Sequence, residues 1–432
     1  MRRRILGGVV VAACALGLVP LARRSFGTGV AHATSALDEP LAKVAQGPLL
    51  PAIPPPPPMP GLDLTKIGLD DKGVSAPMEG HKVARLTIDP ELQRHALTVM
   101  AAHKLPEAAI VMIDPETGHV LVYASHIEGA VARDLCAEAT APAASVFKVV
   151  TGSALVENAG LSPDTKQCFS GGEQKILASD LEDDPVRDRW CSTLSGAMGR
   201  SINTVFARLA LKHLKPPVLE DTAHAFGFGE PVPFDVPVQA SAVHIPTDTL
   251  GFARTAAGFW NTTLSPLQAA QLSATVARGG EPIRPMVVSA VTEANGQPIW
   301  TAASSPITLK RAIAPATAQA VTTMMEHTVA EGTSYRAFHD AKGTAFLPGI
   351  TVAGKTGTLT DDKARRFYTW FTGFAPSKPM PGVKSVAIAV LVVNLPTWQV
   401  KANVVAREML HAYFAEQKVP GLLRPPRIAH KD

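Results

Sequence analysis

The sequence has few of the residues that metal, nucleotide and nucleic-acid sites usually need. Its four cysteines, in 432 residues, form no Cys-x-x-Cys pair and no zinc-ligand spacing. The chain contains neither His-Glu-x-x-His nor a glycine-rich phosphate loop. Charged residues make up 18%, the net charge is +4, and no basic stripe is interleaved with aromatic side chains. We therefore expect no metal, no cofactor and no nucleic-acid partner.

Apolar residues, in contrast, make up 46% of the chain, which suits a globular protein with a large core. One largely apolar run, from Ile5 to Ala22, follows three arginines at the N-terminus. A positive segment followed by about 18 apolar residues is typical of exported proteins. It fits an uncleaved signal anchor, a cleaved signal peptide ending near Ala31-His32-Ala33, or a lipoprotein attached at Cys14. Each alternative predicts export, and a signal anchor also predicts a membrane contact through this segment.

Residues 25–80 show little periodic pattern and include a polyproline stretch from Pro54 to Pro58. Such a stretch is stiff and extended, so we expect a spacer. A proline-rich ligand for a small recognition module is the alternative, and it fits a cytoplasmic protein better. We expect order to begin near Val83, which divides the chain into residues 1–24, a signal anchor or signal peptide, residues 25–80, a linker, and residues 81–420, a folded domain.

Strand patterns stand at both ends of this domain, with helical patterns between them. Residues 109–113 and 120–124 are rich in β-formers and flank a turn sequence at 114–118, so they predict an antiparallel hairpin. Residues 161–280 predict helices and loops. Further strands are expected at 287–291, 367–374 and 386–393, and helices at 314–329 and 402–416. The predicted fold class is α+β: an antiparallel sheet flanked by helices, with an inserted, mostly helical subdomain.

Two of the cysteines bracket a polar segment, residues 170–190. In an exported domain, Cys168 and Cys191 are the pair expected to form a disulfide, and Cys136 would remain a thiol. The alternative is that all three are small buried hydrophobic residues.

The most apolar predicted helix begins at Ser145 and ends near Asn158. Ser145 is expected to be its N-cap, and Lys148 in the first turn shares its face. Burial would favour the uncharged form of Lys148, and a hydroxyl beside such an amine is an activated nucleophile. The amides of the helix N-terminus would suit an oxyanion. A plain cap beside a lysine that reaches solvent is the alternative for so short a motif.

Two weaker motifs follow. Ser201 is expected to cap the next helix, with Asn203 near its start. Lys355-Thr356-Gly357-Thr358 ends a β-branched run, and glycine in a strand lets a ligand or another backbone come close. Lys355 has short neighbours there, so it is placed to meet an anionic group.

Ser-x-x-Lys at 145, Ser-x-Asn at 201 and Lys-Thr-Gly at 355 occur once each, in this order. Together they resemble the transpeptidase domain of the penicillin-binding proteins, in particular the high-molecular-weight monofunctional members. The resemblance covers residues 83–415, including the stretches 86–93, 114–118, 262–280, 331–333 and 353–358. One departure is Ala143-Ala144 before Ser145, where the family usually has Gly-Ser or Gly-Thr, and it predicts a stiffer turn.

The resemblance implies that Ser145 attacks the carbonyl between two D-alanines of a peptidoglycan stem peptide and that Lys148 accepts its proton. Ser201 would relay a proton to the leaving amine, and Asn203 would orient the substrate amide. An amine of a second stem peptide would then take the acyl group. β-Lactams would acylate Ser145 in the same way.

The resemblance also implies a carboxylate site on the strand. Lys355, Thr356 and Thr358 would hold the terminal carboxylate, and Gly357 would let the strand lie against the peptide. The amides of Ser145 and Thr358 would form the oxyanion hole.

Alternatives remain within and outside this fold. A β-lactamase of the class that uses Glu-x-x-x-Asn is disfavoured because the chain has no such motif between Ser201 and Lys355. A D,D-carboxypeptidase keeps all three motifs, and a non-catalytic scaffold of a wall-synthesis complex is a third alternative. The short region before Val83 leads us to expect a separate glycosyltransferase as partner, and a location at the inner (cytoplasmic) membrane with a periplasmic or extracytoplasmic domain.

Overall fold

The computed structural model describes residues 59–71, 73–173, 175–395 and 400–422. The predicted signal segment and the prolines from Pro54 to Pro58 lie outside these ranges. Within them, no helix combines the length and the apolar character needed to cross a membrane.

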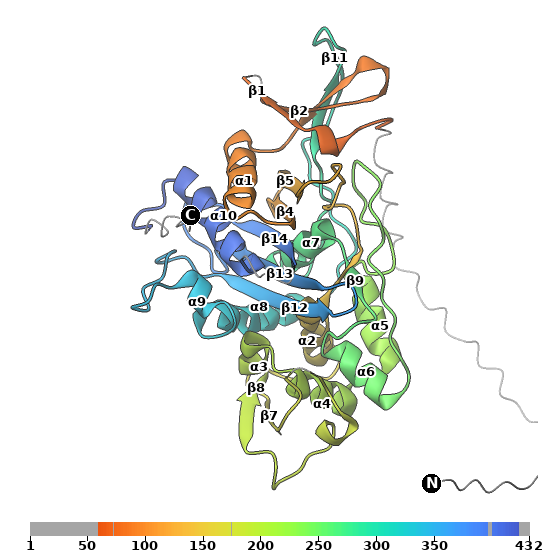
Figure 1. Cartoon of the computed structure of the whole chain (residues 1–432), viewed down its shortest axis with the longest axis vertical. Helices are drawn as coiled ribbons and strands as arrows, with labels where there is room; N and C mark the ends of the chain where they lie inside the picture. The colour runs from red at the N-terminus through yellow and green to blue at the C-terminus, as the bar shows by residue number, and fades with distance from the viewer. Residues whose placement is uncertain (1–58, 72, 174, 396–399, 423–432) are drawn as a thin grey trace, which may run out of the picture. The chain divides into compact units, whose positions relative to one another are not determined.

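The central element is a five-stranded antiparallel sheet, which confirms the predicted hairpin and the predicted fold class (Figure 1). Three of its strands come from the C-terminal third of the chain and two from the hairpin, so the sheet closes late in the sequence. In order across the sheet they are β12 (Ala353–Asp361), β13 (Arg366–Ala375), β14 (Val386–Asn394), β4 (Glu107–Ile113) and β5 (Val120–Ile127).

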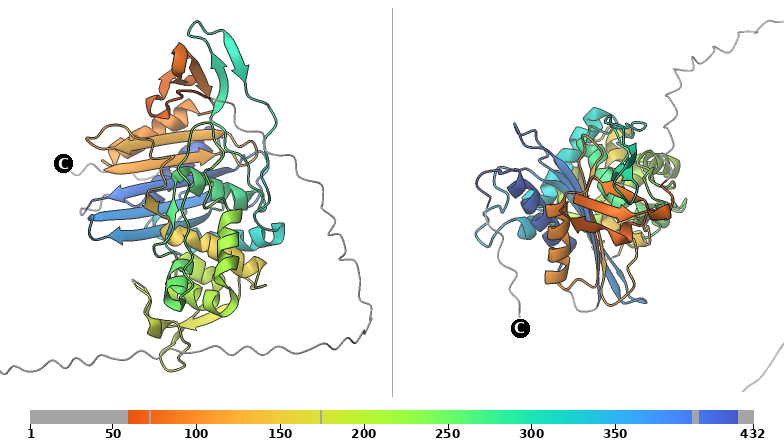
Figure 2. Two further views of the ribbon diagram at one scale, coloured as in Figure 1. Left: turned by 90° about the vertical axis from the view of Figure 1, so that its right-hand side faces the viewer. Right: turned by 90° about the horizontal axis from the view of Figure 1, so that it is seen from above.

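Helices cover both faces of this sheet (Figure 2). The central strand β14 is buried along its whole length, and its side chains alternate between two apolar clusters. One cluster includes α1 (Pro90–Ala102) and α10 (Ala402–Glu416), and the other includes α2 (Lys148–Glu157) and α7 (Pro266–Ala277). A strand buried on both faces needs no polar alternation, which explains its continuous apolar sequence.

The regular elements of the inserted region between α2 and α7 are mostly helices, as the sequence predicts, and loops join them. The region holds α3 (Leu194–Arg200), α4 (Asn203–His213), α5 (Pro216–Ala225) and α6 (Thr249–Ala256), with a two-stranded ribbon of β7 (Lys166–Phe169) and β8 (Trp190–Thr193). Further along the chain, α8 (Pro315–Ala330) packs against both α3 and β12, and the short α9 (Tyr335–Phe338) follows it. α8 therefore connects α3 of the inserted region to β12, the edge strand of the central sheet.

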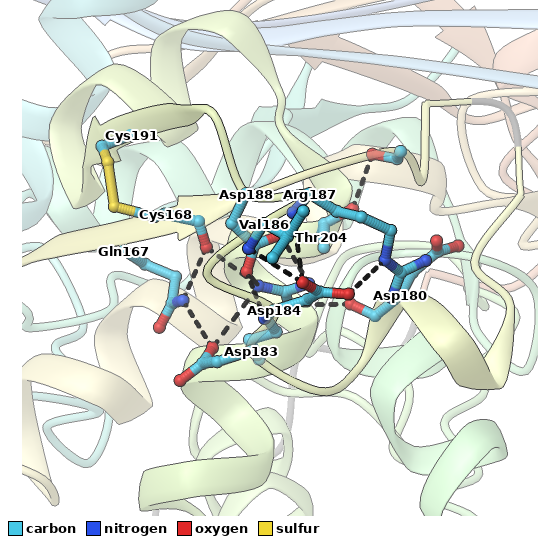
Figure 3. Close-up of polar contacts among 12 residues, drawn as sticks. Gln167, Cys168, Asp180, Asp183, Asp184, Val186, Arg187, Asp188, Cys191 and Thr204 are labelled. Carbon is cyan, nitrogen blue, oxygen red and sulfur yellow. Dashed lines mark hydrogen bonds and ion pairs between the residues drawn. A yellow bond between two sulfur atoms is a disulfide. The ribbon is translucent and has the colours of Figure 1, made fainter.

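A disulfide links Cys168 of β7 to Cys191 of β8 (Figure 3). Cys136 is a buried thiol. Both outcomes confirm the predicted pairing. The bond closes the base of the loop between the two strands.

Order begins earlier than the sequence predicts. Residues assigned to the linker form β1 (Gly68–Asp70) and β2 (Gly73–Pro77), which join β3 (Val83–Leu86), β10 (Val288–Thr292) and β11 (Pro298–Thr301) in a second antiparallel sheet. Leu64, Val74 and Ala76 are buried in its core. Strands this short show only one or two alternating apolar residues, so their pattern is too weak to recognise before the partner strands are known.

The loop between β7 and β8 is fixed to α4 by a polar stripe. Thr204, Arg208 and Lys212 are spaced four residues apart and therefore share one face of the helix. Thr204 donates to the carbonyl of Gly171 (2.8 Å), and Lys212 bonds to Asp183.

Arg208, at the centre of this stripe, is completely buried. It donates to the carbonyls of Cys168 and Asp180 and forms an ion pair with Asp188, whose side chain is 5% exposed. Hydrogen bonds of Asp183, Asp184 and Asp188 within the loop complete the arrangement (Figure 3). A buried ion pair with this many partners leaves the loop few alternative positions.

Candidate active site

Ser145 lies in a 3-10 turn ahead of α2, not at an N-cap as the sequence predicts. The turn spans Ala144–Phe147, and α2 begins at Lys148. Ala144 has a left-handed backbone with φ of 49°, a conformation that costs a residue with a Cβ about 1–2 kcal/mol. The strain falls on one of the two alanines that depart from the family pattern. Trp370 of β13 donates to the carbonyl of Pro142 (2.9 Å) and so ties the turn to the sheet.

The amine of Lys148 is completely buried and lies 2.8 Å from Ser145 Oγ. Its other two partners are Asn203 Oδ1, at 2.7 Å, and the carbonyl of Ala257. Both of these oxygens can only accept hydrogen bonds, whereas the serine hydroxyl can also donate. An uncharged amine has two hydrogens and one lone pair. It would give the hydrogens to Asn203 and Ala257 and turn the lone pair to the hydroxyl, which is the arrangement of a general base.

The electrostatics favour the same protonation state. Burial lowers the pKa of Lys148 well below 10.5, and the nearby Lys355 amine lowers it further. Among the described residues, no carboxylate forms an ion pair with Lys148 to oppose this. The uncharged amine, required to accept a proton from Ser145, is therefore more accessible than that of a lysine in water.

Ser201 and Asn203 stand at the break between two helices. Ser201 ends α3 in a left-handed conformation, with φ of 59°, and α4 begins at Asn203. The sequence prediction that Ser201 caps α4 is therefore wrong, although Asn203 does begin the helix. Serine is a common N-cap, so local pattern alone assigned it to the helix that follows rather than to the end of the one before.

The side-chain amide of Asn203 makes contacts on both sides. Its oxygen accepts from Lys148, and its nitrogen donates to the carbonyls of Gly172 (3.1 Å) and Glu173 (2.8 Å). Both donors are thus used within the protein. In this structure Asn203 joins the base to the loop between β7 and β8.

Lys355 is the second completely buried amine. It donates to Ser201 Oγ (2.9 Å) and to the carbonyl of Thr356, and burial lowers its pKa to about 7. A buried amine with this pKa is partly charged at neutral pH, and an anion bound nearby would stabilise the charged form. The predicted anion site and the Ser201 hydroxyl are therefore adjacent.

The predicted strand residues line one wall of a cleft. Gly357 on β12 passes the Ser145 turn so closely that an added Cβ would lie 3.2 Å from the Cβ of Trp370 and 3.3 Å from the carbonyl oxygen of Ala143. The backbone of the strand can approach the nucleophile because this residue has no side chain. The cleft is lined by Ser145, Glu173, Ser201, Asn203, Thr333, Thr356, Gly357, Thr358, Thr369, Trp370, Lys401 and Asn403.

The structure thus brings all eight predicted residues into one site. Six of them line the cleft, and Lys148 and Lys355 lie buried behind it. Within the described ranges, no group of three or more His, Cys, Asp or Glu residues has the arrangement of a metal site.

Sequence reasoning missed several contributors. Thr333 lies 2.6 Å from Thr356, hydroxyl to hydroxyl, and its backbone N–H donates to the carbonyl of Gly199 (2.9 Å). It therefore ties the turn that holds Ser201 to β12. Thr333 belongs to one of the stretches that resemble the family, residues 331–333, but no local sequence pattern indicated its contact with Thr356. Lys401 and Asn403 gave no signal at all, because they reach the cleft only through the packing of α10.

Gly258 is a further missed residue, and it supports the nucleophile from behind. It has φ of 83°, and a Cβ there would lie 2.5 Å from the carbonyl oxygen of Ala144 and 2.9 Å from Ser145 Cα. The preceding residue, Ala257, accepts a hydrogen bond from Lys148. The turn before the Thr262–Gly280 stretch thus contacts both the nucleophile and the base.

We expect Gly258→Ala to slow acylation of Ser145 by more than about tenfold, because displacing the nucleophile by a fraction of an ångström disrupts its alignment with the base. The rate of labelling by a fluorescent penicillin measures this. Gly160→Ala is the matched control, since Gly160 has φ of 65° and open space around it. It should lose stability through backbone strain alone and keep its labelling rate. Equal labelling rates in the two variants would contradict the contact.

The family model for the penicillin binding protein transpeptidase domain matches residues 108–410. The chain therefore belongs to this family. The match covers the central sheet and all of the residues in the predicted motifs.

Curated relatives agree with this assignment. The chain is 27% identical over 344 residues to the peptidoglycan D,D-transpeptidase PbpA of Mycobacterium tuberculosis, covering 71% of this chain and 66% of that protein. It is 24% identical to stage V sporulation protein D of Bacillus subtilis, covering 70% of this chain and 49% of that protein. The chain therefore spans less than two thirds of the length of these relatives.

Solved structures share the fold. The crystal structure of PBPA from Mycobacterium tuberculosis aligns with a TM-score of 0.62 at 23% identity, over 77% of this chain and 80% of that chain. The D,D-transpeptidase domain of a peptidoglycan glycosyltransferase from Eggerthella lenta aligns with a TM-score of 0.63, also at 23% identity, over 77% and 83% of the two chains.

Proposed function

We propose that this protein is a D,D-transpeptidase that cross-links peptidoglycan stem peptides through an acyl-enzyme on Ser145. The observation that carries the proposal is the contact of Ser145 with a completely buried amine whose other two partners can only accept hydrogen bonds. Support also comes from the name of PbpA, and from a structure of PBPA described as its penicillin G acyl-enzyme complex.

In the acylation step, Ser145 Oγ attacks the carbonyl carbon between the two terminal D-alanines while its proton passes to Lys148. The amides of Ser145 and Thr358 stabilise the oxyanion. When the C–N bond breaks, the leaving D-alanine nitrogen takes a proton from Lys355 through Ser201, which accepts a hydrogen bond from that amine. Solvent then removes the proton that Lys148 accepted and supplies one to Lys355, so both amines return to their starting states. The acyl group remains on Ser145 as an ester.

The terminal carboxylate of the donor binds beside Lys355, Thr356 and Thr358. Because the pKa of Lys355 is about 7, its amine is only partly charged before the substrate binds. The bound carboxylate then stabilises the charged form of the amine. Asn203 holds Lys148 in place. When the substrate enters, the side-chain NH₂ group of Asn203 would release one loop carbonyl and donate to the substrate backbone instead.

The decisive experiment separates transpeptidase from its alternatives. The protein is incubated with a stem pentapeptide and a primary amine, and the products are resolved by mass spectrometry. A transpeptidase gives the amide adduct and free D-alanine, whereas a carboxypeptidase gives only the hydrolysed tetrapeptide. Rapid turnover of penicillin would indicate a β-lactamase, and the absence of any product or acyl-enzyme would indicate a scaffold. Any of these three results would contradict the proposal.

The remaining predictions extend the same proposal. The proposed partners are stem peptides, β-lactams and a separate glycosyltransferase that supplies the glycan strands to be cross-linked. Residues 1–24 would attach the protein to the inner (cytoplasmic) membrane or direct its export, and the proline-rich segment would space the domain from it. The catalytic domain is proposed for residues 81–420, extended by the ordered strands β1 and β2 upstream. It would lie on the periplasmic or extracytoplasmic side, where peptidoglycan is assembled.

A further inference from the structure

The cleft has an uneven charge distribution. Of the described residues that line it, two are charged, Glu173 and Lys401. Behind the cleft lie two buried amines, Lys148 and Lys355, with no carboxylate paired to either. A cationic ligand would meet repulsion from the partly charged Lys355, and Glu173 is the one acidic lining residue in the described ranges that opposes it.

Glu173 is exposed, and its carboxylate makes no hydrogen bond or ion pair with the described residues. Most acidic residues of the same loop behave differently. Asp183 and Asp188 bond to Lys212 and Arg208 of α4, and Asp184 bonds to Arg187. The unpaired carboxylate at the cleft thus contrasts with acids that hold the loop in place.

The backbone at Glu173 is nevertheless fixed relative to the nucleophile. Its carbonyl accepts from Asn203, Asn203 accepts from Lys148, and Lys148 contacts Ser145. On the far side, the stripe of α4 and the disulfide hold the rest of the loop. A short series of hydrogen bonds therefore connects the backbone of Glu173, which carries the free carboxylate, to the reacting hydroxyl.

We propose that Glu173 binds the ammonium group of the acyl acceptor and so determines that acceptors are amines carrying a positive charge in solution. This inference rests on the proposed function. It names the chemical class of the second substrate, a primary alkylammonium of a stem peptide, and assigns its recognition to the loop between β7 and β8.

The chemistry balances as follows. The bound ammonium loses one proton to water, and its nitrogen attacks the acyl carbon of the ester on Ser145. The C–Oγ bond breaks, the amide bond forms, and the second proton of the nitrogen returns to Ser145 Oγ through Lys148. Glu173 takes no proton in this sequence; it raises the local concentration of the acceptor against water.

The test compares two acceptors on the full-length protein with a stem pentapeptide donor at pH 7.5. Nα-acetyl-lysine amide is cationic, because a lysine side chain has a pKa of about 10.4, and hydroxylamine is uncharged. For Glu173→Gln we expect the KM of the lysine acceptor to rise about fivefold, the upper range for an exposed charge pair, with little change in kcat. Glu173→Lys should raise it further. The KM of hydroxylamine should change far less in both variants.

Glu182→Gln is the matched control, since it removes the same charge from an exposed position of the same loop that does not line the cleft. Its acceptor kinetics should equal those of the wild type. Added salt should weaken the lysine preference of the wild type and not that of Glu173→Gln.

The outcomes separate the two levels of the argument. Equal changes for both acceptors, or none for either, would overturn the role of Glu173 while leaving the transpeptidase intact. If the wild type forms neither adduct, the proposed function fails, and this inference fails with it.

Discussion

Ser145→Ala is expected to abolish covalent labelling by a fluorescent penicillin. Removal of a catalytic nucleophile costs about 10⁶ in rate, so no band above background should remain on a denaturing gel. The hydroxyl is irreplaceable here because it is the group held 2.8 Å from the buried amine. Water cannot form the stable ester that the label reports.

The structure supplies a control for this result. Ser179→Ala makes the same substitution at an exposed serine of the loop between β7 and β8, and it should label like the wild type. Both variants should melt at nearly the same temperature, since neither removes core volume. Labelling that survives in Ser145→Ala would move the nucleophile to another residue.

Lys148→Ala should reduce the acylation rate by about 10³-fold, within the range for loss of a positioned general base. Lys148→Arg is the sharper variant, because arginine keeps a positive charge in the pocket but cannot give up its proton. If Lys148 acts only as a charge, the arginine variant should recover part of the rate. If it acts as the base, both variants should lose about 10³-fold in acylation rate while circular dichroism shows them folded.

The pH profile of the wild type gives an independent check on Lys148. A general base works in its deprotonated form, so acylation should be lost as pH falls through the pKa of Lys148 in the folded protein. Burial lowers that pKa well below 10.5, so the rate should reach its plateau at a pH well below the ordinary pKa of lysine. A rate that rises only near the ordinary pKa of lysine would show that the amine is not desolvated.

Local sequence predicted those elements whose signals are strong over a short range. The hairpin of β4 and β5, for example, has two runs rich in β-formers around a turn sequence. The prediction failed where two elements compete for one residue. Ser201 suits a helix start, yet it ends α3 because the chain bends there to bring the hydroxyl to Lys355.

The residues that surround the motifs needed the folded chain. Glu173, Gly258 and Thr333 contact the nucleophile turn or the motif residues from distant parts of the sequence, and each is unremarkable among its neighbours. From the sequence alone, Gly258 would be interpreted as an ordinary glycine at a helix end. Only the approach of Ala144 and Ser145 shows that a side chain at Gly258 would displace the catalytic turn.

The sequence by itself determined which functional groups are available: a serine with a lysine one helical turn away, an anion site on a glycine-flanked strand, and a cysteine pair in a polar segment. The tertiary structure decided their chemical state. It removed water from both lysines, gave Lys148 two acceptors that leave its lone pair for Ser145, and left Glu173 unpaired at the cleft. Residue order sets which groups exist, whereas protonation and reactivity depend on burial and on neighbours that only long-range packing supplies.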